Sequence, residues 1–467
     1  MSAHLNQSRR ACQIKTLQNQ FAQKEGLPFA NLLSAERVER VLREEKAIWS
    51  ERLYTPVVTL WAFLSHVISA DGSCRKTVAR VLAWLVAQGR PACSPKTDPY
   101  CKARQRLPEA VFVRLTRETG RHLHSLAEPE WRWKGRPVKL GDGTTASMPD
   151  TPANQQAYPQ SKTQKPGVGF PILRMMCVFC LATGVVLNAA LAPYRGKKTG
   201  ENALLRSLLD SFCPHDIFLA DRYFSGYFDV ALLKQRGVDA VTRAHQLRAR
   251  DFRQGRRLGD LDHVVIWSKP QRPAWMERVT YLLLPATMAM REVAVAVAQP
   301  GFRTKHIIVQ TTLLDANFAS AHDLADLYRC RWHAELDLRS LKITLGMDIL
   351  TCKTPDMVRK EIWAHFLAYN LIRGLIAQTA HDLGAAPRQF SFKGALSFLL
   401  EFAMRLDSAR GATADELRDW LLIAIGSYQV QDRPDRIEPR RRKRRPKNYP
   451  PLNTPRSEAR TRLLNAA

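Results

Sequence analysis

A short segment near residue 330 carries a carboxylate, two cations and a phenol at spacings that suit one face of a helix. In chain order these side chains are Tyr328, Arg331, Glu335 and Lys342. At 100° per residue, all four fall within a stripe about 60° wide. An adjoining stripe holds apolar residues that would pack on a sheet: Leu327, Leu338, Leu341 and Leu345. The pattern indicates a carboxylate held among cations beside a buried helix face. A solvated charged face is the alternative if the segment is taken alone.

Two aspartates could bring further carboxylates to the same place. Asp142 follows an apolar strand-like run at 138–140 within Gly-Asp-Gly, and Asp221 directly follows a second run at 217–220. Because ligands gather at the carboxyl ends of strands in α/β sheets, we expect both aspartates to converge with Glu335.

Three such carboxylates would offer hard oxygen ligands of the kind that Mg²⁺ or Mn²⁺ prefers. Two ions about 4 Å apart can activate a water or a 3′-hydroxyl and stabilise the leaving oxygen of a phosphodiester. Tyr328, Arg331 and Lys342 would then hold the flanking phosphates. The residue types therefore predict phosphodiester chemistry.

The charge balance indicates a polyanionic partner. The 467 residues include 71 Lys and Arg against 43 Asp and Glu, a net charge of +28. The tail from Gln431 holds twelve basic and four acidic residues, which leaves +20 on the preceding chain. The positive field therefore belongs to the body, and it favours a protein that grips a nucleic-acid duplex. The polar first twenty residues do not resemble a secretory signal, and the scattered cysteines fit a reduced cytoplasmic protein.

Changes in texture along the chain predict the elements that position these residues. Helix-period apolar positions dominate the first part, and short β-like runs begin at Trp131. The apolar stretch at 175–193 is divided by Thr183 and Gly184, which favours two adjacent strands over a membrane span. The predicted divisions are a helical N-terminal DNA-binding region (1–130), the first part of an α/β core (131–225), a β-rich insertion (226–305), the second part of the core with the signature helix (306–385), a helical C-terminal region (386–430) and a basic tail (431–467).

Together these motifs resemble a known family. The spacing of Tyr328, Arg331, Glu335 and Lys342 matches the Tyr-Arg-Glu-Lys signature of bacterial insertion-sequence transposases of the "insertion sequence four" family, which belong to the DDE class. Leu-Gly-Asp-Gly-Thr-Thr around Asp142 is similar to the family's first aspartate motif. Leu-Ala-Asp-Arg-Tyr-Phe around Asp221 is similar to the second. The likeness runs from about residue 54 to residue 445.

The resemblance implies an RNase H-like catalytic core interrupted by a β-rich insertion, with helical N-terminal and C-terminal regions. It implies that Asp142, Asp221 and Glu335 bind two Mg²⁺ ions, for which Mn²⁺ can substitute. The protein would bind the terminal inverted repeats of an element, nick DNA at its ends and join the freed 3′-hydroxyls to target DNA. It would act on DNA as a homodimer, in the cytoplasm and nucleoid of a bacterium, without a membrane.

The resemblance also implies how flanking residues meet DNA. Arg222 would join Tyr328, Arg331 and Lys342 in contacting phosphates, and Trp332 occupies the position of a base-stacking residue in members that form a DNA hairpin. A second tryptophan expected in the last strand before the signature is absent from 307–312, and Trp267 and Trp275 lie earlier, in the insertion. A hairpin intermediate is therefore left open.

Two other functions remain compatible with the sequence. One is a catalytically inactive DNA-end-binding protein derived from such a transposase, although all three carboxylates and Lys342 are present. The other is a structure-specific nuclease on the same core. A cleavage assay separates the first from an active enzyme, and strand-transfer products would exclude the second.

Overall fold

The computed structural model describes residues 32–47, 53–69, 71–87, 89, 91–245, 250–297, 306–406, 412–430 and 450–466. Its α-helices are α2 (Ala35–Glu44), α3 (Pro56–Ile68), α4 (Cys74–Ala87), α5 (Asp98–Arg106), α6 (Glu109–Ser125), α7 (Pro152–Ala157), α8 (Glu201–Arg206), α9 (Tyr227–Gln235), α10 (Arg278–Leu283), α11 (Ala321–Arg329), α12 (Trp332–Arg339), α13 (Pro355–Asp382), α14 (Phe392–Leu406), α15 (Ala412–Gly426) and α16 (Arg456–Asn465). Four 3₁₀ turns, η1 (Pro129–Trp131), η2 (Leu209–Ser211), η3 (Arg222–Phe224) and η5 (Pro387–Gln389), and one π-turn, η4 (Ser340–Thr344), complete the helical elements among these residues.

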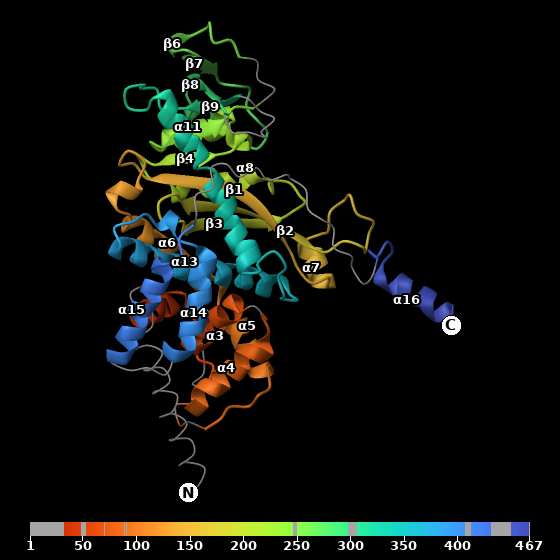
Figure 1. Cartoon of the computed structure of the whole chain (residues 1–467). Coiled ribbons are helices and arrows are strands. Elements are labelled where there is room, and N and C mark those ends of the chain that lie inside the picture. Colours follow the sequence, from red (N-terminus) through yellow and green to blue (C-terminus); the bar gives the residue numbers. More distant parts are fainter. Residues whose placement is uncertain are drawn as a thin grey trace.

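A mixed nine-stranded sheet forms the centre of the molecule (Figure 1). Its strands are β1 (Val138–Ser147), β2 (Ile172–Cys180), β3 (Val186–Pro193), β4 (Ile217–Ala220), β5 (Asp239–Arg243), β6 (Arg256–Gly259), β7 (Asp262–Ser268), β8 (Thr287–Ala296) and β9 (His306–Thr311). They lie in the order β3-β2-β1-β4-β5-β9-β8-β7-β6. Only the pairings of β1 with β4 and of β4 with β5 are parallel. The chain is therefore a mixed α/β protein with one large sheet.

The register of β1 and β4 determines where the two aspartates lie. The parallel pairing begins at Val138↔Ile217 and ends at Gly141↔Ala220. Asp142 and Asp221 each follow the last paired residue of their strand, so they emerge side by side at one edge. The expected strand at 138–140 is longer in the structure, because β1 continues through Asp142 to Ser147 while pairing with β2.

The apolar stretch at 175–193 forms the antiparallel hairpin of β2 and β3, as predicted. Gly184 has φ +80° in the connecting turn, a conformation that L side chains rarely adopt. No helix in the part of the chain that the structure describes has the length and apolar character needed to span a bilayer.

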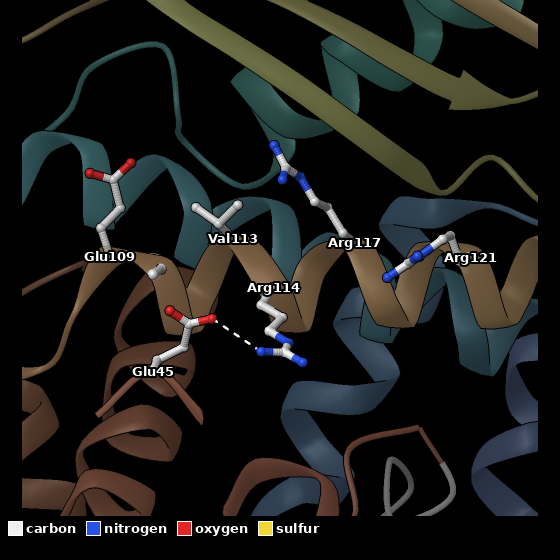
Figure 2. A pocket seen from close by; sticks show the side chains of 7 residues that line it. Glu45, Glu109, Val113, Arg114, Arg117 and Arg121 are labelled. Carbon is white, nitrogen blue, oxygen red and sulfur yellow. Dashed lines mark hydrogen bonds and ion pairs between the residues drawn. The ribbon is translucent and has the colours of Figure 1, made fainter. Parts of the chain in front are cut away.

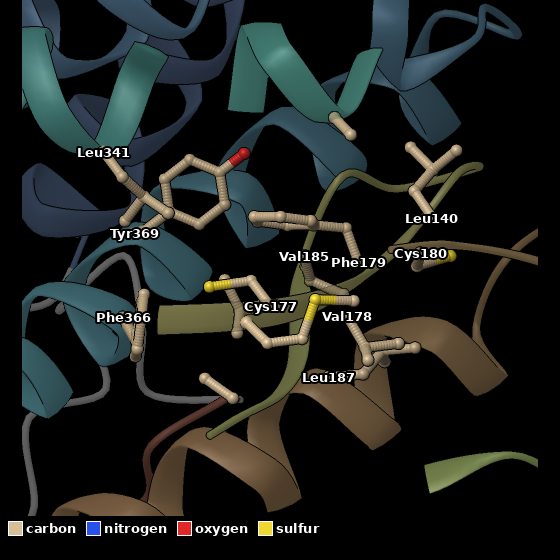
Figure 3. Packing of buried hydrophobic residues seen from close by; sticks show 14 of the residues in the cluster. Leu140, Cys177, Val178, Phe179, Cys180, Val185, Leu187, Leu341, Phe366 and Tyr369 are labelled. Carbon is tan, nitrogen blue, oxygen red and sulfur yellow. The ribbon is translucent and has the colours of Figure 1, made fainter. Parts of the chain in front are cut away.

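The long helix α13 anchors the helical regions to the sheet. It is buried over most of its length and packs against α3, α6 and α15. Figure 3 shows Phe366 and Tyr369 of α13 beside Leu341 and the β2–β3 hairpin. Since Leu341 belongs to the signature segment, this apolar contact holds the segment against the core. The predicted apolar stripe is confirmed: Leu327, Leu338, Leu341 and Leu345 are all buried.

Strands from the predicted insertion extend the same sheet. β5 pairs with β4 on one side and with β9 on the other, and β8, β7 and β6 continue outward from β9. In Figure 1 these outer strands lie at the end of the molecule opposite to α3, α4 and α5. The tail's run of six basic residues at 440–445 lies outside the described residues.

Candidate active site

Each aspartate at the sheet edge is held by a local backbone contact. Asp142 Oδ1 accepts a 2.8 Å hydrogen bond from the N–H of Gly143. Asp221 Oδ1 accepts a 2.8 Å bond from the N–H of Tyr223, which caps the turn η3. These bonds fix both carboxylates near the strand ends that carry them.

The electrostatics of Asp142 show that the three predicted carboxylates lie close enough to interact. Burial raises the pKa of Asp142 to about 6, and the charges of Asp221 and Glu335 raise it further. The N–H of Gly143 and the guanidinium of Arg331 oppose this rise in pKa. A carboxylate that is desolvated and repelled by two others is poorly compensated by the protein alone.

The signature segment is not one regular helix, contrary to the sequence expectation. α11 ends at Arg329, and residues 330–334 tighten into i→i+3 hydrogen bonds: Arg331 N–H to Tyr328 O (3.1 Å), His333 N–H to Cys330 O (3.0 Å) and Ala334 N–H to Arg331 O (3.0 Å). After α12 the backbone widens into the π-turn η4, where the N–H of Leu345 donates to Ser340 O over 3.0 Å. Irregular helical turns of both kinds recur at functional sites.

The tight turn places Arg331 against Glu335. Arg331 Nη2 donates to Glu335 Oε1 over 2.6 Å, and both side chains are partly buried. Tyr328 lies beside them: burial raises the pKa of its phenol, while the nearby charges of Arg331 and Arg243 lower that pKa. The phenol, the guanidinium and the carboxylate therefore form one cluster, as the spacing predicted.

The π-turn brings the fourth signature residue to strand β1. Lys342 Nζ lies 3.2 Å from Thr144 Oγ1, two residues beyond Asp142. Side chains at positions i and i+2 of a strand lie on the same face. Lys342 thus occupies the face of β1 from which Asp142 projects.

The donor set at this edge suits a divalent cation. Carboxylate oxygens are the ligands that Mg²⁺ and Mn²⁺ prefer, and a cation would compensate the charge of Asp142. Within the described residues, no three Asp, Glu, His or Cys side chains are already grouped to hold a metal ion. One oxygen of Glu335 is instead engaged by Arg331.

Comparison with known proteins bears directly on this cluster. Residues 133–371, which contain all the residues described above, match the model of the transposase DDE domain. The chain belongs to the DDE transposase family. It is 29% identical over 433 residues to the transposase InsG of insertion sequence element IS4 from Escherichia coli K12, which covers 90% of this chain and 92% of InsG. The family predicted from the Tyr-Arg-Glu-Lys signature is confirmed.

Two further similarities are more limited. The transposase of insertion sequence element IS421 from Escherichia coli is 38% identical over 71 residues, 15% of this chain and 19% of that protein. A cryo-EM structure of the piggyBac transposase synaptic complex with hairpin DNA aligns over 88% of this chain and 85% of that one, with 10% identity and a TM-score of 0.40. At that TM-score the alignment shows no more than a loose likeness in shape.

The remaining predicted residues of the transposase lie at the surface around the carboxylates. Arg222 is exposed on η3, directly after Asp221. Trp332 is 52% exposed at the first position of α12, so its indole is accessible to a ligand. Trp267 is buried, and Trp275 stacks on the guanidinium of Arg206 at 3.7 Å.

The sequence reasoning missed two acidic residues that support the site. Asp337 lies on the opposite side of α12 from Glu335 and is fully buried, where its Oδ1 accepts from Tyr369, Arg373 and Arg388. Glu201, at the start of α8, lies under strand β1. A Cβ on Gly143 would lie 2.3 Å from the Glu201 carboxyl carbon. The alternation of helix positions could have flagged Asp337 as a buried acid, whereas no sequence signal pointed to Glu201.

A separate hollow opens beside α6 in the transposase, with a volume of about 530 Å³ (Figure 2). Its lining includes Arg114, Arg117 and Arg121, but none of the signature residues. Arg114 is paired with glutamates such as Glu45, so part of this positive charge is neutralised within the protein. The hollow is therefore distinct from the carboxylate cluster.

Proposed function

We propose that this chain cleaves DNA at the terminal inverted repeats of an insertion sequence and transfers the resulting 3′-hydroxyl ends into target DNA, with Mg²⁺ or Mn²⁺. The observation that carries the proposal is the electrostatic contact of Asp142 with Asp221 and Glu335 at one sheet edge, beside the three basic or phenolic signature residues. The family match to a DDE transposase domain over the same residues supports it. We propose an RNase H-like core for this part of the sheet.

In this proposal Asp142, Asp221 and Glu335 hold two divalent ions, and Arg331 turns from Glu335 to a DNA phosphate. Bound there, the ions would activate an attacking oxygen and stabilise the leaving oxygen of a phosphodiester. Lys342, Tyr328 and Arg222 bind neighbouring phosphates, and Trp332 stacks on a base exposed near the cut. These residues fix the scissile phosphate relative to the three carboxylates.

The reaction consists of two displacements at phosphorus. First, water attacks at the element end and the 3′-oxygen leaves, taking a proton to become a hydroxyl. That hydroxyl then attacks a target phosphodiester, so one P–O bond forms as another breaks. The N-terminal helices (1–130) are proposed to bind the inverted repeats, and a homodimer on DNA to pair the two ends.

The test uses DNA that carries the sequences flanking this gene, with purified full-length protein and Mg²⁺. Wild type, Glu335→Ala and the control Glu401→Ala, an exposed position on α14, are compared with products mapped at nucleotide resolution. We expect end cleavage and joined products from wild type and the control only. Binding without cleavage by wild type would instead identify an inactive end-binding protein, and cleavage without joining would identify a nuclease.

A further inference from the structure

An exposed tyrosine lies next to the second aspartate of the site. Tyr223 is 54% exposed, although it follows Asp221 by only two residues. Its backbone N–H donates to Asp221 Oδ1 over 2.8 Å. The position of the ring is therefore tied to the position of that carboxylate.

The ring is supported on one side and open on the other. Its edge packs on Phe224, with the ring centroids 5.8 Å apart and the planes at 89°. Phe224 is itself buried against Phe218, and the Asn202 amide donates to the carbonyl of Tyr223 over 3.2 Å. A Cβ on Gly200 would lie 3.9 Å from the Tyr223 hydroxyl, so the phenol reaches the start of α8. The aromatic surface is anchored and accessible.

A basic turn leads into Gly200 from the other direction. Lys197 and Lys198 are both exposed, and neither forms an ion pair with any residue that the structure describes. Thr199 Oγ1 closes the turn by donating to Gly196 O over 3.0 Å. Two uncompensated cations therefore precede the point that the tyrosine hydroxyl approaches.

We propose that Tyr223 and residues 195–200 bind one unpaired nucleotide of the DNA strand that is cut. Its base stacks on the exposed face of the Tyr223 ring, and its phosphates contact Lys197 and Lys198. Aromatic rings beside cations are the combination that binds single-stranded nucleic acid without sequence preference. A base within a duplex keeps both faces stacked, so the site requires a nucleotide that has left the helix. This inference rests on the proposed function, because that function brings a DNA strand to Asp221.

The proposal separates a stacking contribution from a charge contribution. Base–aromatic stacking contributes about 1–3 kcal/mol, which corresponds to about a 5- to 150-fold change in dissociation constant. It does not depend on salt, since no counterion is released. Each lysine–phosphate contact instead adds about 0.7 to the slope of log affinity against log salt for a single strand.

The experiment measures binding of full-length protein to a mixed-sequence single-stranded oligonucleotide that carries one 5-iodo-deoxyuridine, without divalent metal. We expect photocrosslinking to Tyr223, identified by mass spectrometry. Tyr223→Ala should weaken binding about 5- to 150-fold with an unchanged salt slope, while Tyr223→Phe should bind within about twofold of wild type. Lys197→Ala combined with Lys198→Ala should lower the slope by about 1.4. Binding of the fully paired duplex should be unaffected by Tyr223→Ala.

Single-strand binding by Tyr223→Ala as tight as that of wild type, or crosslinks confined to other residues, would overturn the inference. Thermal unfolding of each variant shows whether it folds. The crosslink on wild type and the Tyr223→Phe comparison give an answer even if the alanine variant is unstable. A wild type that crosslinks through Tyr223 but never cuts element ends contradicts the proposed function alone. End cleavage with no role for Tyr223 in binding contradicts this inference alone.

Discussion

Asp337 and Arg388 form a two-pronged ion pair beneath the signature helix. Arg388 Nη1 lies 2.7 Å from Asp337 Oδ1, and Nη2 lies 3.0 Å from Oδ2. The same guanidinium donates to the carbonyls of Leu181 and Cys180, at the end of β2. β2 pairs with β1, which carries Asp142. The ion pair therefore links the helix of Glu335 to the strand neighbour of Asp142.

Replacing Asp337 by asparagine should destabilise the protein strongly. The change leaves two buried arginines, Arg373 and Arg388, without their carboxylate, and breaking a buried ion pair from one side costs about 3–5 kcal/mol. Urea unfolding measures the loss. The control is Asp326→Asn on α11, whose partner Arg329 is exposed, and it should change stability by less than about 1 kcal/mol. Equal effects of the two variants would show that the buried pair does not hold the segment.

Gly143→Ala should disturb the underside of β1. The new methyl would lie 2.3 Å from the Glu201 carboxyl carbon, so the glutamate must move, at about 1–3 kcal/mol. Thermal or urea unfolding tests this, with Gly200→Ala as the control, because the nearest atom to a Cβ there is 3.9 Å away. The double variant Gly143→Ala with Glu201→Ala should recover most of the loss. Additive effects would mean that the two residues are not in contact.

Lys342→Ala should weaken duplex DNA binding alike for all sequences. If Lys342 contacts a phosphate, its loss lowers the slope of log affinity against log salt by about 0.9. Thr144→Val removes the hydroxyl that Lys342 contacts, but not the charge, so it should leave the slope unchanged. Titrations at four salt concentrations would measure both variants. An unaltered slope in Lys342→Ala excludes the phosphate contact.

Acid should destabilise the fold partly through His333. Burial, and next the charge of Arg388, lower its pKa to about 4, with Arg373 acting in the same direction and Asp337 opposing. The unfolded chain binds the proton near pH 6.5, so this stability is present above that pH and is lost as the pH falls towards 4. At pH 5 the loss is on the order of 1–2 kcal/mol.

Urea unfolding at pH 7 and pH 5 checks the role of His333. His333→Gln should lose less stability than wild type between the two values. The exposed control His322→Gln should behave like wild type, since its side chain is 86% exposed. If His333→Gln and wild type respond equally to pH, the histidine is not buried in its neutral form.

Local patterns in the sequence predicted the elements that lie inside the core. The apolar runs of β2, β3 and β4 are bounded by turn residues, and their ends agree with the prediction to within a few residues. The longer extent of β1 was missed because Gly-Asp-Gly-Thr-Thr is typical of a turn. Its pairing with β2 across Asp142↔Cys177 keeps these residues extended.

Contacts between distant parts of the chain could not be predicted. Asp337 depends on Arg388, which is 51 residues away, and Glu201 depends on the absence of a side chain at Gly143. The signature residues were expected on one regular helix at 100° per residue. They cluster in the structure because the backbone tightens before α12 and widens after it.

The π-turn at Ser340–Thr344 has a consequence for how this chain can vary. A turn closed by an i→i+5 hydrogen bond contains one more residue than an α-helical turn of the same rise. Deleting any one of these five residues would restore a regular helix and rotate everything that follows by about 100° relative to Glu335. Leu345 and Met347 would then leave the core in which both are buried. Substitutions can be absorbed along this stretch, but a change in its length cannot, so functional relatives should vary here in letters and not in number.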